Sequence, residues 1–209
     1  MKWPAMGYAR VESLAELWRV MDEAGPEAQI LAGGQSLLAT LSFRLSEPSG
    51  LIDITRIPAL KGISVQGAVL RIGVLTRHAD LGSDPLVAAH APLLAQAAPL
   101  IAHPAIRNRG TIGGSLALAD PAAELPACVV ALGATIVIAS RAGERRIAAE
   151  DFFQGLFTTD LQPGEIIAAV EVPVATPASR QTIVEVTRRS GDYAMAGLAN
   201  GAFIPKPRL

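Results

Sequence analysis

Two glycine pairs, each followed by a serine within two residues, constrain the fold of this chain more than any other feature of its sequence. One pair lies in the segment 32–36 (AGGQS) and the other in the segment 111–115 (TIGGS). Because glycine has no Cβ atom, these positions can adopt positive φ and let another group approach the backbone closely. Successive unpaired N–H groups in such a turn form a concave site for an anion, most often a phosphate. Two such turns could together hold the two phosphates of a dinucleotide, whereas either one alone is more simply a turn between regular elements.

The residues around the first pair place it between a strand and a helix. The segment 28–32 predicts a short strand that leads directly into the glycines, and the segment 37–45 predicts a helix that follows Ser36. At such a junction, free N–H groups meet the positive end of the helix dipole, and both favour an anion. The first glycine turn is therefore predicted to be an anion site.

Two patterns of secondary structure follow each other along the chain, and together they indicate an α+β fold. Residues 1–56 predict a small parallel α/β unit, in which Ser13 and Glu16 form the capping box of the first helix. Residues 57–177 predict an α+β unit with antiparallel strands and a helix capped by Thr76.

The last segment, residues 178–209, predicts the start of a third unit. Two strands are expected at 184–189 and 193–203. Because a sheet of two strands is only marginally stable by itself, something is expected to cover it. The proline-containing end, IPKPRL, is poor material for a strand or a helix, and we expect a truncated C-terminal domain.

The single cysteine limits the redox chemistry that the polypeptide can carry by itself. Cys128 is the only cysteine among 209 residues, and a protein-held iron–sulfur cluster needs about four thiolates. It lies in an apolar run and is predicted to be a buried small side chain rather than a nucleophile. The three histidines, His78, His90 and His103, lack the spacing of metal ligands. No metal site and no catalytic side chain are predicted, so the chemistry is expected to come from a bound group.

Charge and hydropathy argue against two classes of partner. The net charge is −1 and only 18% of residues are charged, which gives no electrostatic basis for binding nucleic acid or an anionic membrane. No run of sequence reaches the roughly 18 apolar residues of a membrane span. The N-terminal segment MKWPAMGYAR carries charge and a proline where a signal peptide needs an apolar region. We therefore expect a soluble, cytoplasmic protein.

Seven short motifs occur in a fixed order and carry a resemblance to a known family. They are AGGQSLL, LIDITRIPAL, HPAIRNRGTIGGSLALADPAAELPA, ALGA, EDFFQGLF, PGEII and RRSGDYA. Together they resemble the FAD-binding medium subunit of the molybdenum hydroxylases, the family of xanthine oxidase and carbon monoxide dehydrogenase. The resemblance covers residues 4–199 and implies the vanillyl-alcohol-oxidase (PCMH)-type FAD-binding fold. The parallel and antiparallel units described above agree with the first two subdomains of that fold.

The resemblance also implies which residues contact FAD. Both glycine segments would bind the pyrophosphate, Asp120 or Glu124 would supply an acid on the ribose or adenine side, and Ile101, Ile167 and Tyr193 would line the flavin pocket. A carboxylate at a helix start, core packing and a plain strand tyrosine are the respective alternatives. The implied cofactor-binding residues are Ala32, Gly33, Gly34, Gln35, Ser36, Ile101, Thr111, Ile112, Gly113, Gly114, Ser115, Asp120, Glu124, Ile167 and Tyr193.

The sequence leaves open the roles of two arginines next to the second glycine pair. Arg107 and Arg109 either face the cofactor or stabilise their own loop. Leu118 replaces a polar residue that is common in this segment of the family.

The resemblance implies an electron-transfer function. Such a chain would take electrons from iron–sulfur clusters of a small subunit and pass them through FAD to an external acceptor. A molybdenum cofactor in a large subunit would oxidise the substrate, and a dimer of heterotrimers is a possible assembly. Two alternatives are a cofactor-free assembly module, in which the glycine turns are empty, and a self-contained FAD oxidase, for which no catalytic base is found.

Overall fold

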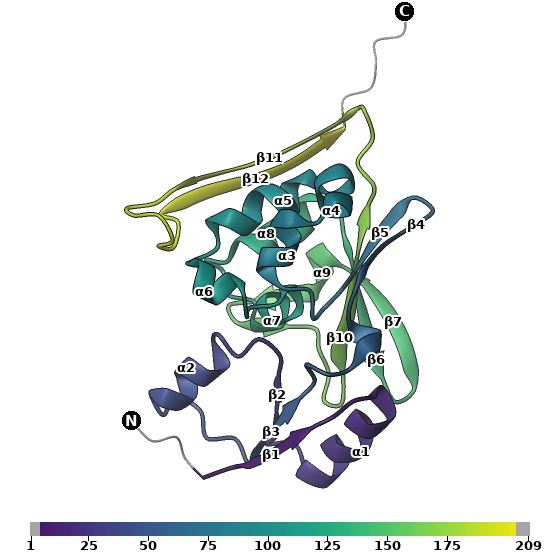
Figure 1. The fold of residues 1–209 in the computed structure, drawn as a ribbon, viewed down its shortest axis with the longest axis vertical. Helices are drawn as coiled ribbons and strands as arrows, with labels where there is room; N and C mark the ends of the chain where they lie inside the picture. Colours follow the sequence, from purple (N-terminus) through teal and green to yellow (C-terminus); the bar gives the residue numbers. More distant parts are fainter. Residues whose placement is uncertain (1–4, 204–209) are drawn as a thin grey trace, which may run out of the picture.

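The computed structural model describes residues 5–203, which form three larger sheets, one small two-stranded sheet and helices that pack on them (Figure 1). The first sheet, at the bottom of Figure 1, is parallel and contains β1 (Gly7–Arg10), β3 (Gly50–Asp53) and β2 (Gln29–Leu31) in that order. Helix α1 (Leu14–Ala24) connects β1 to β2, and α2 (Leu37–Ser42) connects β2 to β3. The predicted parallel α/β unit is thus confirmed.

The first helix begins where the sequence predicts. The side chain of Ser13 accepts a hydrogen bond from the Glu16 N–H (3.1 Å), and the Glu16 carboxylate accepts one from the Glu12 N–H (2.8 Å). This reciprocal pair satisfies two backbone donors that the first helical turn cannot satisfy itself. The helix ends at Gly25, whose φ of 77° favours glycine.

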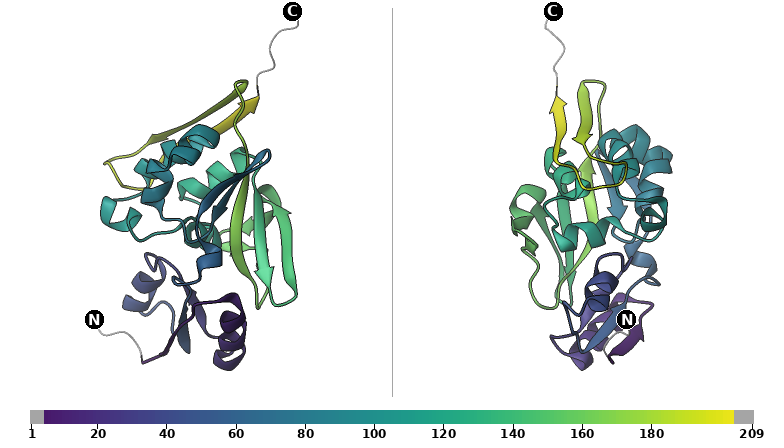
Figure 2. Two further views of the ribbon diagram at one scale, coloured as in Figure 1. Left: turned by 45° about the vertical axis from the view of Figure 1, so that its right-hand side comes forward. Right: turned by 90° about the vertical axis from the view of Figure 1, so that its left-hand side faces the viewer.

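The second sheet has five antiparallel strands and lies above the first sheet, along one side of the molecule (Figure 2). Its order is β4 (Ile63–Gln66), β5 (Val69–Gly73), β10 (Ile166–Pro173), β6 (Thr135–Ser140) and β7 (Gly143–Ala148). Strand β10 pairs with β5 and β6 on its two sides, and its first five residues are buried. The antiparallel α+β character predicted for the middle of the chain is therefore confirmed.

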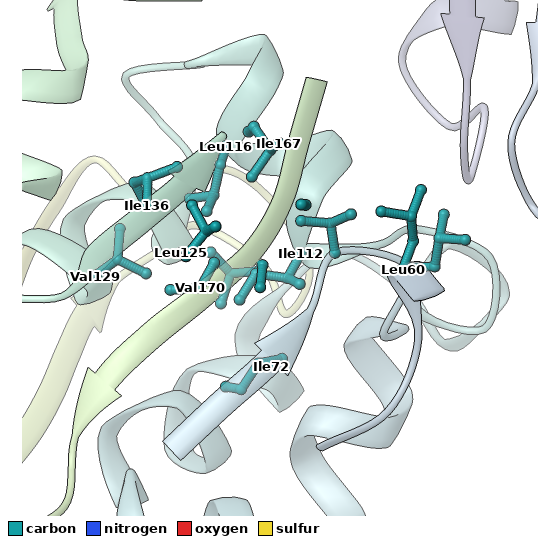
Figure 3. Close-up of a cluster of buried hydrophobic side chains, with 14 of the residues drawn as sticks. Leu60, Ile72, Ile112, Leu116, Leu125, Val129, Ile136, Ile167 and Val170 are labelled. Carbon is teal, nitrogen blue, oxygen red and sulfur yellow. The ribbon is translucent and has the colours of Figure 1, made fainter. Parts of the chain in front are cut away.

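Most of the helices lie in the two long connections of this sheet, the one from β5 to β6 and the one from β7 to β10. Between β5 and β6 they are α3 (His78–Ser83), α4 (Pro85–His90), α5 (Pro92–Ala97), α6 (Pro104–Arg107), α7 (Ile112–Leu118), α8 (Glu124–Ala131) and the 3-10 helix η2 (Ala98–Leu100). The 3-10 helix η1 (Pro58–Leu60) precedes β4, and α9 (Ala149–Phe152) leads into the small hairpin of β8 (Phe153–Gly155) and β9 (Thr158–Thr159). Helices α7 and α8 and the strands of the sheet enclose the core that Figure 3 shows.

The third sheet is a two-stranded hairpin, β11 (Ser179–Val186) and β12 (Ala196–Phe203), which lies across α5 and α8. Its inner face carries Ile183 and Ala199 against the core, and the Gln181 side chain accepts a hydrogen bond from the Leu93 N–H (3.0 Å). Its outer face exposes Val184 (60%) and Leu198 (67%). Each sheet draws its strands from one of the predicted units, while the predicted boundaries at residues 56 and 177 stay predictions.

Two local predictions are wrong. Thr76 does not cap α3, which begins two residues later with Arg77 as its N-cap. The Asp80 side chain accepts from the Arg77 N–H, and Thr76 instead closes the turn after β5, where its N–H donates to the Gly73 carbonyl (3.0 Å). Tyr193 does not lie in a strand, because β12 begins only at Ala196 and residues 187–195 form the turn of the hairpin.

Candidate functional site

The two glycine pairs are 80 residues apart in sequence, but the parts of the chain that carry them lie against each other. A Cβ atom built on Gly33 would stand 2.3 Å from the carbonyl oxygen of Arg109 and 2.8 Å from the Cα atom of Gly110. Gly110 directly precedes the second segment. Only a residue without a side chain allows such an approach between two backbones. The first glycine pair is therefore used, at Gly33, to bring the two segments into contact.

The first segment presents unpaired backbone donors. Among residues 5–203 the structure gives no acceptor for the N–H groups of Gly33, Gly34, Gln35 and Ser36. Gly34 has a φ of 73°, which turns the chain from β2 into α2, and the Ser36 hydroxyl makes no capping hydrogen bond. These donors lie at the start of a helix, where an anion is favoured. This arrangement agrees with the anion site predicted from the sequence.

The second segment is different, and the expectation of free N–H groups there is wrong. The Ile112 N–H donates to the Thr76 carbonyl (3.0 Å), the Gly113 N–H donates to the Val74 carbonyl (3.0 Å), and the Gly114 N–H donates to the Thr111 side chain (3.1 Å). The physical reason is that the chain leaving β5 runs past the first turn of α7 and supplies two of the acceptors, while the N-cap residue Thr111 supplies the third. Whether Thr111, Ile112, Gly113, Gly114 and Ser115 contact FAD stays a prediction.

Gly113 has a packing role in this arrangement. It is buried, and a Cβ atom built on it would stand 2.5 Å from the Cβ atom of Val74. Glycine therefore lets α7 touch the segment that follows β5.

A cleft of ≈ 590 Å³ lies where the two segments meet, between the first sheet and the start of α3. Charged and hydroxyl side chains make up much of its wall, and both subdomains contribute to it. It is lined by Leu31, Ala32, Gly33, Leu38, Asp53, Thr55, Lys61, Gly62, Ile63, Leu75, Thr76, Arg77, Asp80, Asp84, Arg109 and Thr111. Of the residues predicted from the sequence, only Ala32, Gly33 and Thr111 line this cleft.

Several residues that line the cleft were not predicted from the sequence, and Asp53 is the main example. Asp53 lies at the carboxyl end of the central parallel strand β3, a position where ligands commonly bind in parallel sheets. Its carboxylate accepts hydrogen bonds from Tyr8 (2.6 Å) and from the Thr55 hydroxyl (2.6 Å). Burial would raise the pKa of Asp53, but these hydrogen bonds outweigh it and lower the pKa. The only pattern in the sequence that could have indicated Asp53 is its place as a polar residue at the end of the apolar strand 50–53.

A second group of predicted residues gathers outside the cleft. The Tyr193 hydroxyl donates to the Asp120 carboxylate (3.2 Å), although Tyr193 itself is 68% exposed. Glu124 is the first residue of α8, and burial raises the pKa of its carboxyl, with Glu185 and Asp120 adding repulsion. The sequence placed the acids on the adenosine side and Tyr193 at the flavin. Asp120 and Tyr193 are hydrogen-bonded to each other and therefore lie together, while their contacts with FAD stay predictions.

The two isoleucines predicted at the flavin are core residues in this structure. Ile101 and Ile167 are buried, and neither lines the cleft. Figure 3 shows Ile167 among the core side chains, together with Ile112. Core packing thus explains their burial, and a contact with the flavin stays a prediction.

The two arginines beside the second segment have separate roles. The Arg107 guanidinium donates to the carbonyl oxygens of Pro99 (3.2 Å), Ile101 (2.9 Å) and Ala102 (2.8 Å), so it stabilises its own loop. Arg109 lines the cleft, and its guanidinium has no hydrogen bond or ion pair with residues 5–203. Arg109 is therefore the arginine that remains available to a ligand.

The prediction for the single cysteine is confirmed. Cys128 is buried in α8, and burial raises the pKa of its thiol to about 12, which keeps it protonated at neutral pH. Within residues 5–203 no group of three or more histidine, cysteine or acidic side chains could hold a metal ion. No helix in the same range is long and apolar enough to cross a membrane.

Comparison with known proteins identifies close relatives of the whole described region. A family model described as "FAD binding domain in molybdopterin dehydrogenase" matches residues 4–175. The 6-hydroxypseudooxynicotine dehydrogenase complex subunit alpha of Paenarthrobacter nicotinovorans is 44% identical over 200 residues, which cover 96% of this chain and 68% of that protein. The carbon monoxide dehydrogenase medium chain of Hydrogenophaga pseudoflava is 40% identical over 196 residues, covering 94% and 68%.

A solved structure agrees with these sequence matches. A chain of carbon monoxide dehydrogenase from Hydrogenophaga pseudoflava matches with a TM-score of 0.92 and 40% identity, covering 95% of this chain and 69% of that chain. The α+β FAD-binding fold expected from the sequence resemblance is thereby confirmed.

Proposed function

This chain belongs to the family of FAD-binding domains in molybdopterin dehydrogenases, and from that premise we propose that it carries electrons between an iron–sulfur partner subunit and an external acceptor. It is an FAD-binding medium subunit of the molybdenum hydroxylase type. The observation that carries the proposal is the backbone contact of Gly33 with Arg109 and Gly110, which joins the two glycine segments at one cleft.

The residues around the cleft fit a dinucleotide. The unpaired N–H groups of the segment 33–36 suit a diphosphate, and the Lys61 and Arg109 side chains add positive charge. FAD supplies the redox chemistry when it is bound, and the protein supplies position and electrostatics. Ala32 and Thr111 extend the same wall and are proposed as further contacts, with Ser115, Asp120, Glu124 and Tyr193 toward the other half of the cofactor.

The cysteine content supports a separate electron donor. The chain has only Cys128, which is buried and protonated, so it lacks the thiolates of an iron–sulfur cluster. We propose that the clusters reside in a small subunit and the molybdenum cofactor in a large subunit. The names of two relatives, a dehydrogenase complex subunit and a medium chain, support such an assembly. A dimer of such heterotrimers in the cytoplasm is part of the same proposal.

A cofactor-free assembly module is the alternative, and two observations count against it. The family is defined as FAD-binding, and the donors of the segment 33–36 have no partner inside residues 5–203. An assembly module assigns no role to this row of open backbone donors at the start of a helix, whereas a bound anion does.

Titration of the purified chain with FAD tests the proposal directly. We expect saturable quenching of flavin fluorescence, bleaching of the bound flavin by dithionite, and bleaching by a reduced iron–sulfur partner subunit. A chain that binds no FAD would support the assembly module. A chain that binds FAD but accepts no electrons from the partner would refute only the electron-transfer part.

A further inference from the structure

One buried hydroxyl group at the cleft has no partner in the protein. Thr76 lies between β5 and α3 and is only 7% exposed, yet its Oγ1 atom makes no hydrogen bond with residues 5–203. Its backbone is fully used, since its N–H donates to the Gly73 carbonyl (3.0 Å) and its carbonyl accepts from the Ile112 N–H (3.0 Å). A buried hydroxyl without a partner lowers stability, so it calls for an explanation.

Thr55, another threonine that lines the cleft, has a hydroxyl with a hydrogen-bond partner in the protein. The Thr55 hydroxyl donates to the Asp53 carboxylate at 2.6 Å, which fixes its direction. Thr76 has no such neighbour, although it lines the same cleft. The difference indicates that the partner of Thr76 is a molecule that enters the cleft.

The position of Thr76 shows which part of a dinucleotide would reach it. The cleft contains Ala32, Gly33 and Thr111 of the glycine segments but none of the residues predicted at the flavin, Ile101, Ile167 and Tyr193. Tyr193 is instead bonded to Asp120, which lines a second hollow that is mostly apolar. The cofactor would therefore extend from the phosphates into two regions, of which the cleft at Thr76 is the more polar.

The polarity of this cleft suits the adenosine diphosphate half rather than the ring system of a flavin. Lys61 and Arg109 line it with side chains that form no ion pair within residues 5–203. Ribose hydroxyls and phosphate oxygens are hydrogen-bonding groups that such a wall can satisfy, while a flat aromatic ring is better matched by apolar surfaces.

We infer that Thr76 is a cofactor-binding residue, whose hydroxyl hydrogen-bonds to the adenosine diphosphate half of FAD in this cleft. The inference rests on the proposed FAD-binding function and adds to it a residue and a direction for the cofactor. The Thr76 hydroxyl then has a partner only in the loaded protein, which accounts for its lack of one in the polypeptide alone.

Replacing Thr76 by valine tests the inference, because valine has the same shape and no hydroxyl. We expect FAD to bind about three- to tenfold more weakly to Thr76→Val, as a lost hydrogen bond predicts. ADP, measured as a competitor of FAD, should lose the same factor, since it carries only the half that Thr76 contacts. Thermal unfolding of the FAD-free variant should be unchanged or shifted upward, because an unsatisfied group has been removed.

Two further variants serve as controls. Thr76→Ser retains the hydroxyl and should bind FAD within about twofold of the wild type, a small difference on the free-energy scale. Thr182→Val removes a hydroxyl from the exposed outer face of β11 and should alter neither binding nor unfolding.

The outcomes that contradict the inference can be told apart. Equal FAD affinity of Thr76→Val and wild type overturns the inference and leaves the proposed function intact. Weaker FAD binding with unchanged ADP binding, or failure of ADP to compete with FAD, overturns the assignment to the adenosine diphosphate half. A wild-type chain that binds no FAD refutes the proposed function and this inference together. A Thr76→Ser variant that binds as weakly as Thr76→Val also overturns the role of the hydroxyl.

Discussion

The two glycine segments have nearly the same composition, but the molecule uses them in different ways. In the first, Gly33 touches the backbone of another segment, and the N–H groups from Gly33 to Ser36 have no acceptor within residues 5–203. In the second, the N–H groups of Ile112, Gly113 and Gly114 all have acceptors in the protein. The first segment therefore leaves its donors open to a ligand, whereas the second uses its donors to hold α7 in place.

The difference teaches that a glycine pair indicates close approach but does not identify what approaches. At Gly113 the neighbour is Val74, from the chain that leaves β5. At the segment 33–36 the described residues leave the donors open, so a ligand can be the neighbour. Four predictions test this distinction, from the largest expected effect to the smallest.

The largest effect is expected from Gly33→Ala. The new Cβ atom would stand 2.3 Å from the Arg109 carbonyl oxygen, so the two segments would have to separate. Overpacking of this kind costs about 1–3 kcal/mol, and if that cost falls on the cleft, FAD affinity drops by about 10- to 100-fold. Flavin fluorescence titration measures the loss. Gly155→Ala is the matched control, because no atom lies within 4 Å of its Cβ position. Undiminished FAD binding by Gly33→Ala would show that the contact of the segments is not needed.

Gly113→Ala is expected to act on folding. Its Cβ atom would stand 2.5 Å from the Val74 Cβ atom in the core, which should lower the free energy of unfolding by about 1–3 kcal/mol. Urea denaturation of the FAD-free protein measures the change. Gly114→Ala provides the comparison, since Gly114 is exposed and its nearest atom is the Thr111 hydroxyl oxygen at 3.1 Å. Equal losses of stability in the two variants would contradict a packing role specific to Gly113.

The hydroxyl groups that precede the two helices should also differ. Thr111 caps α7 by accepting the Gly114 N–H, so Thr111→Val should cost about 1 kcal/mol of stability. Ser36 makes no capping hydrogen bond, so Ser36→Ala should leave the stability of the FAD-free protein unchanged. Thermal unfolding of both variants provides the measurement. A larger loss for Ser36→Ala than for Thr111→Val would reverse the roles assigned to the two segments.

The smallest effect is expected from pH, and it concerns His78, the first residue of α3, which lies beside Gly110. Burial against Gly110 lowers the pKa of the His78 imidazole. The unfolded chain therefore binds a proton more readily than the folded protein, and stability should fall as pH decreases below about 6.5, the ordinary histidine value. Urea denaturation at pH 7.5 and 5.5 should show a smaller loss for His78→Gln than for the wild type. An identical pH dependence in both proteins would exclude His78 as the cause.

The sequence predicted the elements that depend on short-range patterns. The capping box of Ser13 and Glu16 starts α1, the alternating segments form the antiparallel sheet, and the apolar run around Cys128 is buried. These features follow from residues that are neighbours in the chain, so their physical causes can be read locally.

Other features depended on contacts between distant residues, and there the reading was incomplete. Thr76 has the right residue type for a helix cap, but the helix begins after it and the residue lines the cleft with a buried hydroxyl that has no partner within residues 5–203. Tyr193 reads as a strand residue, yet it lies in a hairpin turn and reaches Asp120 across 73 residues. Local propensity does not reveal such positions.

The sequence by itself determined that the backbone must be approached closely at two places, because glycine pairs leave no side chain there. Only the tertiary structure decided that Val74 approaches one of them, while Gly33 of the other lines a cleft and has an N–H group without an acceptor within residues 5–203. The reason is that the acceptor of a backbone N–H group is chosen by which segment lies beside it in space. That neighbour is set by the packing of whole sheets and helices, which no single stretch of sequence encodes.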